Sequence, residues 1–547
     1  MNVAVNCIGP ANSQGCPNGC ARSVIEARFR FCVCSDRRHV VTREPVSCSG
    51  SVNISIERLW YMLEEASPEF QQMIDQADHS RALRAEILEK GANGRLRLLP
   101  SRIAELILRG GTIGESALEV KTFRDNDQII TYDKLQNPGY WNPNGKITIR
   151  EFAHKIVEAA GLDAVKLLGR NVQEEIIFHI KCQTGIDRGD FEEAEGKICF
   201  ENGTLNLETG QLEPHSAENR FLWRLPVRYD PAATSCPKID KFLNDVLGDR
   251  AALAYEILSY ILCDSENRMQ RAFMFLGAGD NGKSTFLQLL TAVVGAENIA
   301  HIELQSLSEN RFAAAQLQGK LANFAADISD RALYKTSMFK SITGGDDIGA
   351  EHKFCNPFTF HPRAKLVYSC NSLAESYDDS NAFHKRWIIA LFEQTFSGDK
   401  CDRNILSKLV TPEELSGFAN RAIAAYDQVM QTGRFTGEGD TASKREYYTK
   451  LSDPVQCFID ERLLFEPDGQ VKKQLLHSEF QAFCQKHGYG KHYSMKRFFQ
   501  KFREKAGDQI HDTWTHDSDG VKHRTFRGIQ LDLETLNLDT LTAETRT

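Results

Sequence analysis

The sequence predicts an α/β protein: a core of alternating strands and helices, with a mixed α+β region before it and a small unit after it. The short apolar segment 272–276 (AFMFL) precedes a glycine-rich loop and then the helix-compatible run TFLQLLTAVVG. Strand and helix patterns then alternate to about residue 435. Because 547 residues exceed what one hydrophobic core organises, we expect several domains.

The local patterns set the expected boundaries. Apolar spacings of three and four predict helices over about 56–108, 148–183 and 238–262. Turn residues predict a hairpin loop over 137–145 and short strands over 197–230, and polar residues predict a linker over 436–452. We therefore expect a leader over 1–50, an N-terminal region over 51–235, an α/β domain over 236–440, a small unit over 453–533 and a tail over 534–547.

Composition excludes few functions. Hydrophobic residues make up 41% and charged residues 26% of the chain, which is typical of globular proteins. No apolar run reaches the ~18–20 residues that span a bilayer, and a signal peptide pattern is absent, so we expect a cytoplasmic protein. The formal net charge of -8 does not exclude a nucleic-acid partner, because a local stripe of Lys and Arg is enough to bind one.

Cysteines are concentrated at the N-terminus. Six of the 15 lie in the first 48 residues: Cys7, Cys16, Cys20, Cys32, Cys34 and Cys48. Their C-x3-C and C-x-C spacings match a zinc site loosely. A disordered leader and an extension outside the working protein are the alternatives.

The glycine-rich loop carries the most specific motif. Gly277 to Ser284 fits G-x-x-x-x-G-K-[ST] at every fixed position, between a strand and a helix. Glycines let backbone N–H groups turn toward phosphate oxygens, and a helix amino end favours anions. The motif predicts ATP and Mg²⁺ as cofactors, with Lys283 on the phosphates and Ser284 on the metal. The residues expected to bind the nucleotide are Gly277, Gly279, Asn281, Gly282, Lys283, Ser284 and Thr285.

Three polar residues beside apolar strands are candidate catalytic groups. Asp327 ends the run LANFAAD and is a candidate magnesium ligand, the alternative being a helix cap. Asn371 ends KLVYSCN and either positions the attacking water or belongs to a turn. Arg386 lies in the segment HKRW, just before the strand IIALF, and is either an arginine finger for a neighbouring subunit or part of a solvated basic edge.

In this order the motifs resemble helicase superfamily 3 of the AAA+ ATPases, in particular the poxvirus-like and phage/plasmid primase–helicases. The matching segments are 277–285, 311–329, 339–371 and 383–396. Upstream, NGTLNLETGQLEPHS and LPVRYDP are similar to the N-terminal helicase-associated region of that family. The resemblance covers roughly residues 98–533.

The resemblance implies an AAA+ P-loop core and a role for each matching position. Asp327 would be the Walker B acid, Asn371 sensor 1, and Arg386 the finger, with Lys385 as the alternative. The segment 343–360 resembles the hairpin before sensor 1, which would place His352 and Lys353 against DNA. The family often has two adjacent acids in Walker B, whereas Asp327 stands alone, so Asp330 and Glu351 are candidates for polarising the water.

The C-terminal unit resembles the winged helix of these relatives. Helical patterns over 454–464, 473–487 and 494–506 precede a β pair. The third helix interleaves basic residues with aromatic ones, and the aromatic positions are expected in the core. Lys496 and Arg497 are candidate DNA contacts, unless the unit docks a protein instead.

These observations predict an ATP-dependent replicative DNA helicase of a phage, plasmid or other mobile element. We expect a homo-hexamer that translocates on single-stranded DNA, because a finger supplied in trans closes a ring. The N-terminal region lacks room for both a catalytic primase domain and the helicase-associated region, so we expect priming by a separate protein. The alternatives are an origin-binding initiator and a nucleotide-gated scaffold with little turnover.

Overall fold

The computed structural model describes residues 3–5, 52–54, 68–91, 95–109, 118–135, 137–277, 279–326, 333–353, 355–371, 373–374, 376–398, 401–486, 494–516 and 519–532. The N-terminal cysteines considered as zinc ligands lie outside these ranges. The chain divides into two compact units, one formed by 1–99 with 154–169 and the other by 100–153 with 170–547. None of the described helices is long and apolar enough to cross a membrane.

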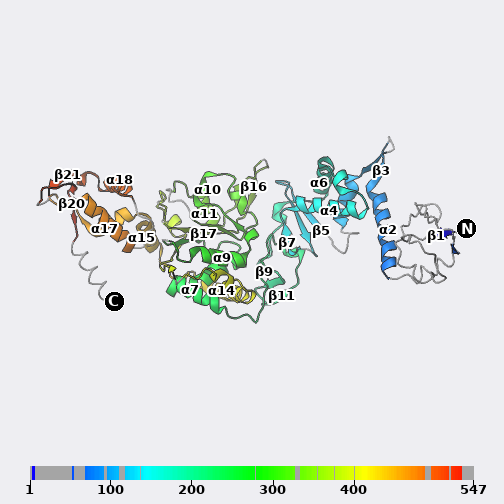
Figure 1. Cartoon of the computed structure of the whole chain (residues 1–547), viewed down its shortest axis with the longest axis horizontal. Coiled ribbons are helices and arrows are strands. Elements are labelled where there is room, and N and C mark those ends of the chain that lie inside the picture. Colours follow the sequence, from blue (N-terminus) through cyan, green and yellow to red (C-terminus); the bar gives the residue numbers. More distant parts are fainter. Residues whose placement is uncertain are drawn as a thin grey trace, which may run out of the picture. The chain divides into compact units, whose positions relative to one another are not determined.

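The first unit contains a long helix and two antiparallel strand pairs (Figure 1). Its elements are β1 (Val3–Val5), β2 (Val52–Ile54), α2 (Pro68–Ile87), β3 (Leu88–Lys90), β4 (Leu96–Leu98) and α5 (Ala164–Leu167). Helical spacing over 56–108 predicted helix throughout, but Leu88 and Leu98 pair across a hairpin instead. Pairing of β3 with β4 overrides the local helical periodicity.

The second unit begins with a four-stranded sheet in the order β7-β6-β5-β8. Its elements are α3 (Pro100–Arg109), β5 (Leu118–Phe123), β6 (Ile129–Asp133), β7 (Asn137–Asn142), α4 (Gly145–Ala159), which runs from this unit into the first, α6 (Arg170–Thr184) and β8 (Gly185–Ile186). The prediction of a loop over 137–145 was wrong for β7. Trp141 is buried there and its indole N–H donates to the Ala217 carbonyl at 3.0 Å, so tertiary burial overrides the turn residues.

Short strands follow, as the turn pattern over 197–230 predicted. They are β9 (Lys197–Phe200), β10 (Gly203–Asn206) and β11 (Leu212–Glu213), which form a three-stranded antiparallel sheet. Ile198, Phe200 and Leu205 are buried in a hydrophobic cluster. The same cluster covers one face of a five-stranded sheet at the centre of the unit, described next. This small sheet is therefore packed into the core of the unit.

A five-stranded sheet forms the centre of the second unit, and all its paired strands are parallel. Its strands are β12 (Ala272–Leu276), β13 (Ile299–Ala300), β14 (Ala322–Ala325), β17 (Lys365–Cys370) and β18 (Trp387–Leu391), in the order β13-β14-β17-β12-β18. Phe273 and Phe275 join one core cluster, whereas Met274 and Leu276 join the other, because successive side chains point to opposite faces. Both faces are therefore buried, as expected of a parallel sheet. The prediction of an α/β fold is confirmed.

Helices cover this sheet (Figure 1). They are α7 (Pro237–Leu247), α8 (Ala252–Cys263), α9 (Lys283–Val294), α10 (Leu304–Glu309), α11 (Ser337–Gly344), α12 (Asn381–His384), α13 (Ile405–Leu409), α14 (Pro412–Thr432) and α15 (Thr441–Ser452). The helix predicted over 238–262 is two helices, because Gly248 adopts φ +58° at the end of α7. The predicted linker over 436–452 is mostly α15, which Asp440 caps and which Tyr448 anchors by burial.

The C-terminal part of the second unit has its own core of aromatic residues. Its elements are α16 (Pro454–Arg462), β19 (Leu463–Leu464), β20 (Gln470–Lys472), α17 (Lys473–Lys486), α18 (Met495–Ala506), β21 (His511–His516), β22 (Lys522–Arg527) and β23 (Gln530–Leu531). Phe498, Phe499 and Phe502 of α18 are buried in this core. The prediction that the aromatic residues of this helix are core residues is confirmed.

Lys365, at the start of β17, is a fully buried cation. Its ammonium group donates to the carbonyl of Arg363 at 3.2 Å and to the side chain of Asn267. Burial lowers the pKa of Lys365 to about 7, against the attraction of Asp264. Because the charged form is disfavoured only in the folded chain, the unfolded chain binds one more proton than the folded chain between pH 7 and the ordinary lysine pKa.

We therefore expect Lys365 to make the protein more stable as pH rises above 7. Relative to the parent, Lys365→Met should raise the free energy of unfolding most below pH 7, where the buried ammonium is fully charged. That difference in unfolding free energy should shrink by about 1.4 kcal/mol per pH unit above 7. Urea unfolding of both proteins between pH 6 and 9.5 measures it, and a difference that does not change with pH would contradict the prediction.

Candidate nucleotide-binding cleft

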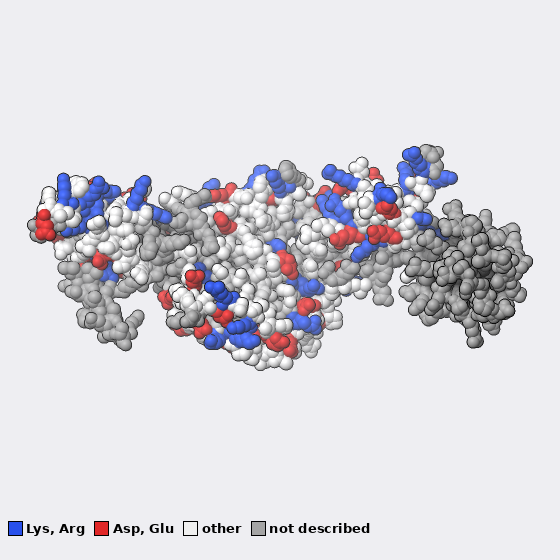
Figure 2. Space-filling model, viewed as in Figure 1, with Lys and Arg blue, Asp and Glu red and all other residues white. Residues whose placement is uncertain are grey.

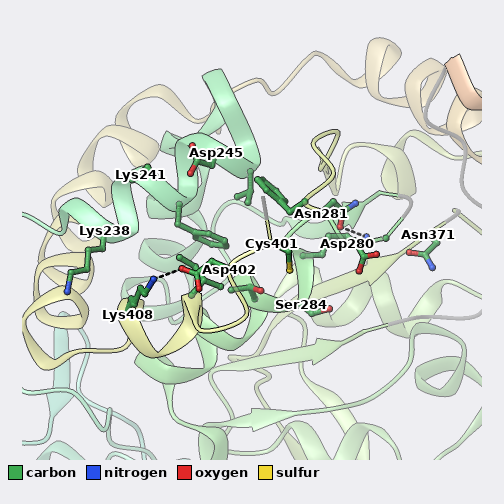
Figure 3. A pocket seen from close by; sticks show the side chains of 18 residues that line it. Lys238, Lys241, Asp245, Asp280, Asn281, Ser284, Asn371, Cys401, Asp402 and Lys408 are labelled. Carbon is green, nitrogen blue, oxygen red and sulfur yellow. Dashed lines mark hydrogen bonds and ion pairs between the residues drawn. The ribbon is translucent and has the colours of Figure 1, made fainter. Parts of the chain in front are cut away.

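The glycine-rich loop borders a cleft of about 600 Å³ (Figure 3). A volume of this size falls in the range of small-molecule and cofactor sites. The lining residues are Lys238, Lys241, Phe242, Asp245, Val246, Gly279, Asp280, Asn281, Gly282, Lys283, Ser284, Thr285, Asn371, Phe396, Cys401, Asp402, Ile405 and Lys408. Most of the residues predicted to bind the nucleotide are thus brought together in one cavity.

Two glycines of the loop are required by its geometry. Gly282 adopts φ +86° as the N-cap of α9, and a Cβ there would lie 2.6 Å from the Val246 side chain. Gly277 packs so closely that a Cβ would lie 2.6 Å from the Phe392 carbonyl. Both glycines therefore lie in close contact with their neighbours, and the amino end of α9 faces the cleft.

Lys283 is held inside the loop. It is buried, and its ammonium group donates to the Gly277 carbonyl at 2.7 Å and to Asn281 Oδ1 at 2.9 Å. The Asn281 amide in turn donates to the Phe392 carbonyl at 3.0 Å, which joins the loop to the end of β18. A desolvated cation at a helix amino end attracts anions strongly, so this part of the cleft suits phosphate.

The opposite wall was not predicted from the sequence. Helix α7 contributes Lys238, Lys241, Phe242, Asp245 and Val246 to this wall. The segment after β18 contributes Phe396, Cys401, Asp402, Ile405 and Lys408. The α7 residues follow the spacing i, i+3, i+4, i+7 and i+8 of one helix face, which is a signal that sequence reasoning had available. In Figure 3, Asp402 and Lys408 form an ion pair of 2.6 Å on this side.

A buried carboxylate positions α7. Glu414 of α14 accepts hydrogen bonds from the backbone N–H of Lys238 at 3.1 Å and of Ile239 at 3.1 Å, and so caps the start of α7 from a distant helix. Nearby, Gly417 approaches the Ser235 carbonyl so closely that a Cβ would lie 2.1 Å away. The wall that carries Lys238 and Lys241 is therefore fixed to α14.

The candidate catalytic residues lie in different places. Asn371 follows β17 and lines the cleft, at the sheet edge where β12 also ends, because these strands are parallel. Asp327 and Asp330 lie outside the described residues. Glu351 is 3.5 Å from Arg311 in an ion pair and does not line the cleft.

Arg386 is buried within its own chain. Its guanidinium donates to the Thr343 hydroxyl at 2.8 Å, to the Lys340 carbonyl at 3.3 Å and to the Ala382 carbonyl. These contacts tie the end of α12 to α11, and Arg386 does not line the cleft. The alternative of a solvated basic edge is therefore wrong, whereas the role of Arg386 as an arginine finger stays a prediction. Lys385 is more exposed than Arg386.

The predicted DNA contacts lie on separate elements. His352 and Lys353 occupy the connection between β15 (Ile348–Ala350) and β16 (Phe358–Phe360), an antiparallel hairpin. Lys353 is exposed, whereas His352 stacks on Phe358 at 5.4 Å. Burial, with a smaller contribution from Arg188, lowers the pKa of His352, so its neutral form is favoured. Lys496 and Arg497 are exposed in the first turn of α18.

Within the described ranges, no group of three or more His, Cys, Asp or Glu side chains is arranged to hold a metal ion. The cysteines near the N-terminus and Asp327 lie outside those ranges. Of the two residues predicted to bind magnesium, only Ser284 is described, and it is exposed at the cleft.

Two family matches cover the middle of the chain. Residues 119–248 match the family described as "D5 N terminal like". Residues 275–386, which span the glycine-rich loop and Arg386, match a family of unknown function (DUF5906).

Viral proteins align with part of the chain. "Putative helicase L207/L206" of Acanthamoeba polyphaga mimivirus is 26% identical over 212 residues, covering 36% of this chain and 22% of the relative. "Putative helicase 121R" of Invertebrate iridescent virus 3 is 26% identical over 223 residues, covering 37% of this chain and 23% of the relative. "Putative helicase V13" of Sputnik virophage is 23% identical over 331 residues, covering 55% of this chain and 41% of the relative. The aligned segments are thus less than half of each relative.

A solved structure, the apo form of the NrS-1 C-terminal region (305-718), aligns with a TM-score of 0.39 and 11% identity over 78% of this chain and 99% of that one. The sequence matches, a D5 N-terminal-like region and viral relatives, support the resemblance to the superfamily 3 helicase–primases of phages and viruses.

Proposed function

We propose that this protein is an ATP-dependent DNA helicase that acts in the replication of a phage, plasmid or other mobile element. The observation that carries the proposal is the glycine-rich loop at the amino end of α9, which lines the cleft together with buried Lys283. The helicase names of the viral relatives and the D5 N-terminal-like region support the DNA-directed part.

The residues of the cleft fit ATP with Mg²⁺. The loop backbone and Lys283 suit the phosphates, and Phe242, Val246 and Phe396 offer apolar surface for the base. Ser284 and Asp327 are the proposed magnesium ligands, and Asn371 the proposed sensor of the terminal phosphate. Bound Mg²⁺ would offset the charge that develops on the phosphate oxygens during hydrolysis.

The proposed assembly is a homo-hexameric ring with ATP at each interface. An arginine finger from the neighbouring subunit, Arg386 or alternatively Lys385, would stabilise the transition state. The β15–β16 hairpin would contact single-stranded DNA through His352 and Lys353. Phosphate contacts of this kind do not depend on base identity, so they suit a motor that moves along any sequence. Priming is proposed to come from a separate primase.

Hydrolysis of ATP with and without single-stranded DNA tests the function. We expect DNA to stimulate hydrolysis and the protein to displace a strand from a forked duplex. Hydrolysis with sequence-specific duplex binding but without strand displacement would favour an origin-binding initiator. ATP binding without turnover would favour a nucleotide-gated scaffold.

Occupancy of the cleft has a readout that does not depend on turnover. Cys401 is exposed and lines the cleft, so bound ATP should slow its alkylation. Cys182 is exposed on α6 and serves as the internal control, because its alkylation should not respond to ATP. Peptide mass spectrometry resolves the two sites, and equal rates with and without ATP at Cys401 would contradict binding in this cleft.

A further inference from the structure

The C-terminal part of the chain exposes a tryptophan that two cations contact. Trp514 of β21 is 51% exposed, whereas the other described tryptophans are buried. The Lys522 ammonium lies 4.6 Å from the centroid of the Trp514 ring, and the Arg524 guanidinium carbon lies 5.4 Å from it. Although both cations lie over the ring, about half of the Trp514 surface stays exposed, so this side chain contributes little to the core and its exposed surface is available to a ligand.

Strand register places the two cations on the same side of the hairpin as the ring. In the antiparallel pair β21–β22, Trp514 lies opposite Arg524, and His516 lies opposite Lys522. Side chains of opposed residues project from one face of a sheet. Among the described residues, neither Lys522 nor Arg524 has an acidic ion-pair partner, so their charge is available to an anion.

The same face of the hairpin continues onto α18. Asp512, two residues before Trp514, receives an ion pair from Arg503 of α18 at 3.1 Å, and Phe526 opposite Asp512 packs against Phe499. Figure 2 shows Lys and Arg side chains gathered over α18 and this hairpin. Trp514, Lys522 and Arg524, with Arg503 at their base, are called the hairpin corner.

We propose that the hairpin corner binds single-stranded nucleic acid. Trp514 stacks on an unpaired base, and Lys522 and Arg524 contact the phosphates on either side of that base. A stacking ring accepts every base, because each has a π face, and cations beside the ring attract the phosphates of the backbone. A duplex hides its base faces except at its ends, so a single strand is the better ligand. The proposal extends the helicase function proposed above but does not depend on the nucleotide cleft.

Tryptophan fluorescence tests the site directly. Full-length protein carrying Lys283→Ala is titrated with short oligothymidylate, so that ATP turnover plays no part in the result. We expect a saturable quench that Trp514→Phe abolishes while it retains most of the affinity. Trp514→Ala should weaken binding by about tenfold to a hundredfold, the effect of losing one stacked base.

The cations have a separate readout in the salt dependence of binding. Lys522→Ala combined with Arg524→Ala removes two phosphate contacts, so the slope of log affinity against log salt should flatten by about 1.4. A charge-matched control is Lys146→Ala with Arg170→Ala, two exposed cations of the N-terminal region, which should leave the quench unchanged. Phe178→Ala, an aromatic residue that is 63% exposed on α6, controls for loss of an exposed ring.

Several outcomes would overturn the proposal. They are a quench that survives Trp514→Phe, an affinity that Trp514→Ala leaves intact, or equal binding of duplex and single strand. Competition by polyglutamate as strong as that by oligothymidylate would instead indicate a site for an acidic protein. Because Trp514 is exposed, each variant should unfold at the parental temperature. A quench in protein that hydrolyses no ATP would support the hairpin corner even if the proposed motor function failed.

Discussion

Lys283→Ala is expected to lower the rate of ATP hydrolysis by about 10²–10³-fold, the usual cost of removing one group that stabilises developing charge. The ammonium group is buried in the loop, where water screens its attraction for phosphate weakly. Its present acceptors, the Gly277 carbonyl and Asn281 Oδ1, lie in the loop itself. The ammonium group of Lys283 is therefore already positioned beside the place that a phosphate would occupy.

Steady-state hydrolysis in the presence of single-stranded DNA measures this effect. Lys408→Ala is the comparator, because it removes a positive charge from the same cleft but from an exposed position paired with Asp402. We expect Lys408→Ala to reduce hydrolysis far less than Lys283→Ala. Equal losses would mean that the overall charge of the cleft matters rather than the position of Lys283. Parental hydrolysis by Lys283→Ala would reject the cleft as the site of turnover.

Arg386→Ala is expected to lower the free energy of unfolding by about 3 kcal/mol, because it leaves buried acceptors without their charged donor. The guanidinium reaches Thr343 and the Lys340 carbonyl, so it joins α11 to the turn before β18. Lys385→Ala next to it should cost much less, because Lys385 is half-buried and makes no such contacts. Urea unfolding of both variants measures the difference, and an unchanged midpoint for Arg386→Ala would contradict the structural role.

A mixture of variants separates this structural role from that of an arginine finger. Subunits carrying Lys283→Ala keep their own Arg386, and subunits carrying Arg386→Ala keep their own Lys283. If the finger acts across an interface, mixing the two should restore part of the hydrolysis that each lacks alone. If Arg386 acts only within its own chain, the mixture should show the average of the two. Lys385→Ala in the same assay tests the alternative finger.

The sequence alone determined the elements that depend on local signals. Glycines of the loop, the apolar strand before it and the apolar helix after it are short-range features, and each lies where the motif predicted. The three C-terminal helices also match their predicted ranges to within a few residues, because their apolar residues recur with helical period. Asp327 stays a prediction, as does the zinc site, since both lie outside the described residues.

Only the tertiary structure decided which distant segments meet. It placed one face of α7, Phe396 and residues 401–408 across from the glycine-rich loop, with Glu414 fixing α7 from another helix. It turned the expected loop at 137–142 into strand β7 and most of the expected linker into α15, because Trp141 and Tyr448 are buried against partners far along the chain. It also enclosed Arg386. Burial depends on contacts between residues distant in sequence, whereas turn and helix signals reflect only neighbouring residues.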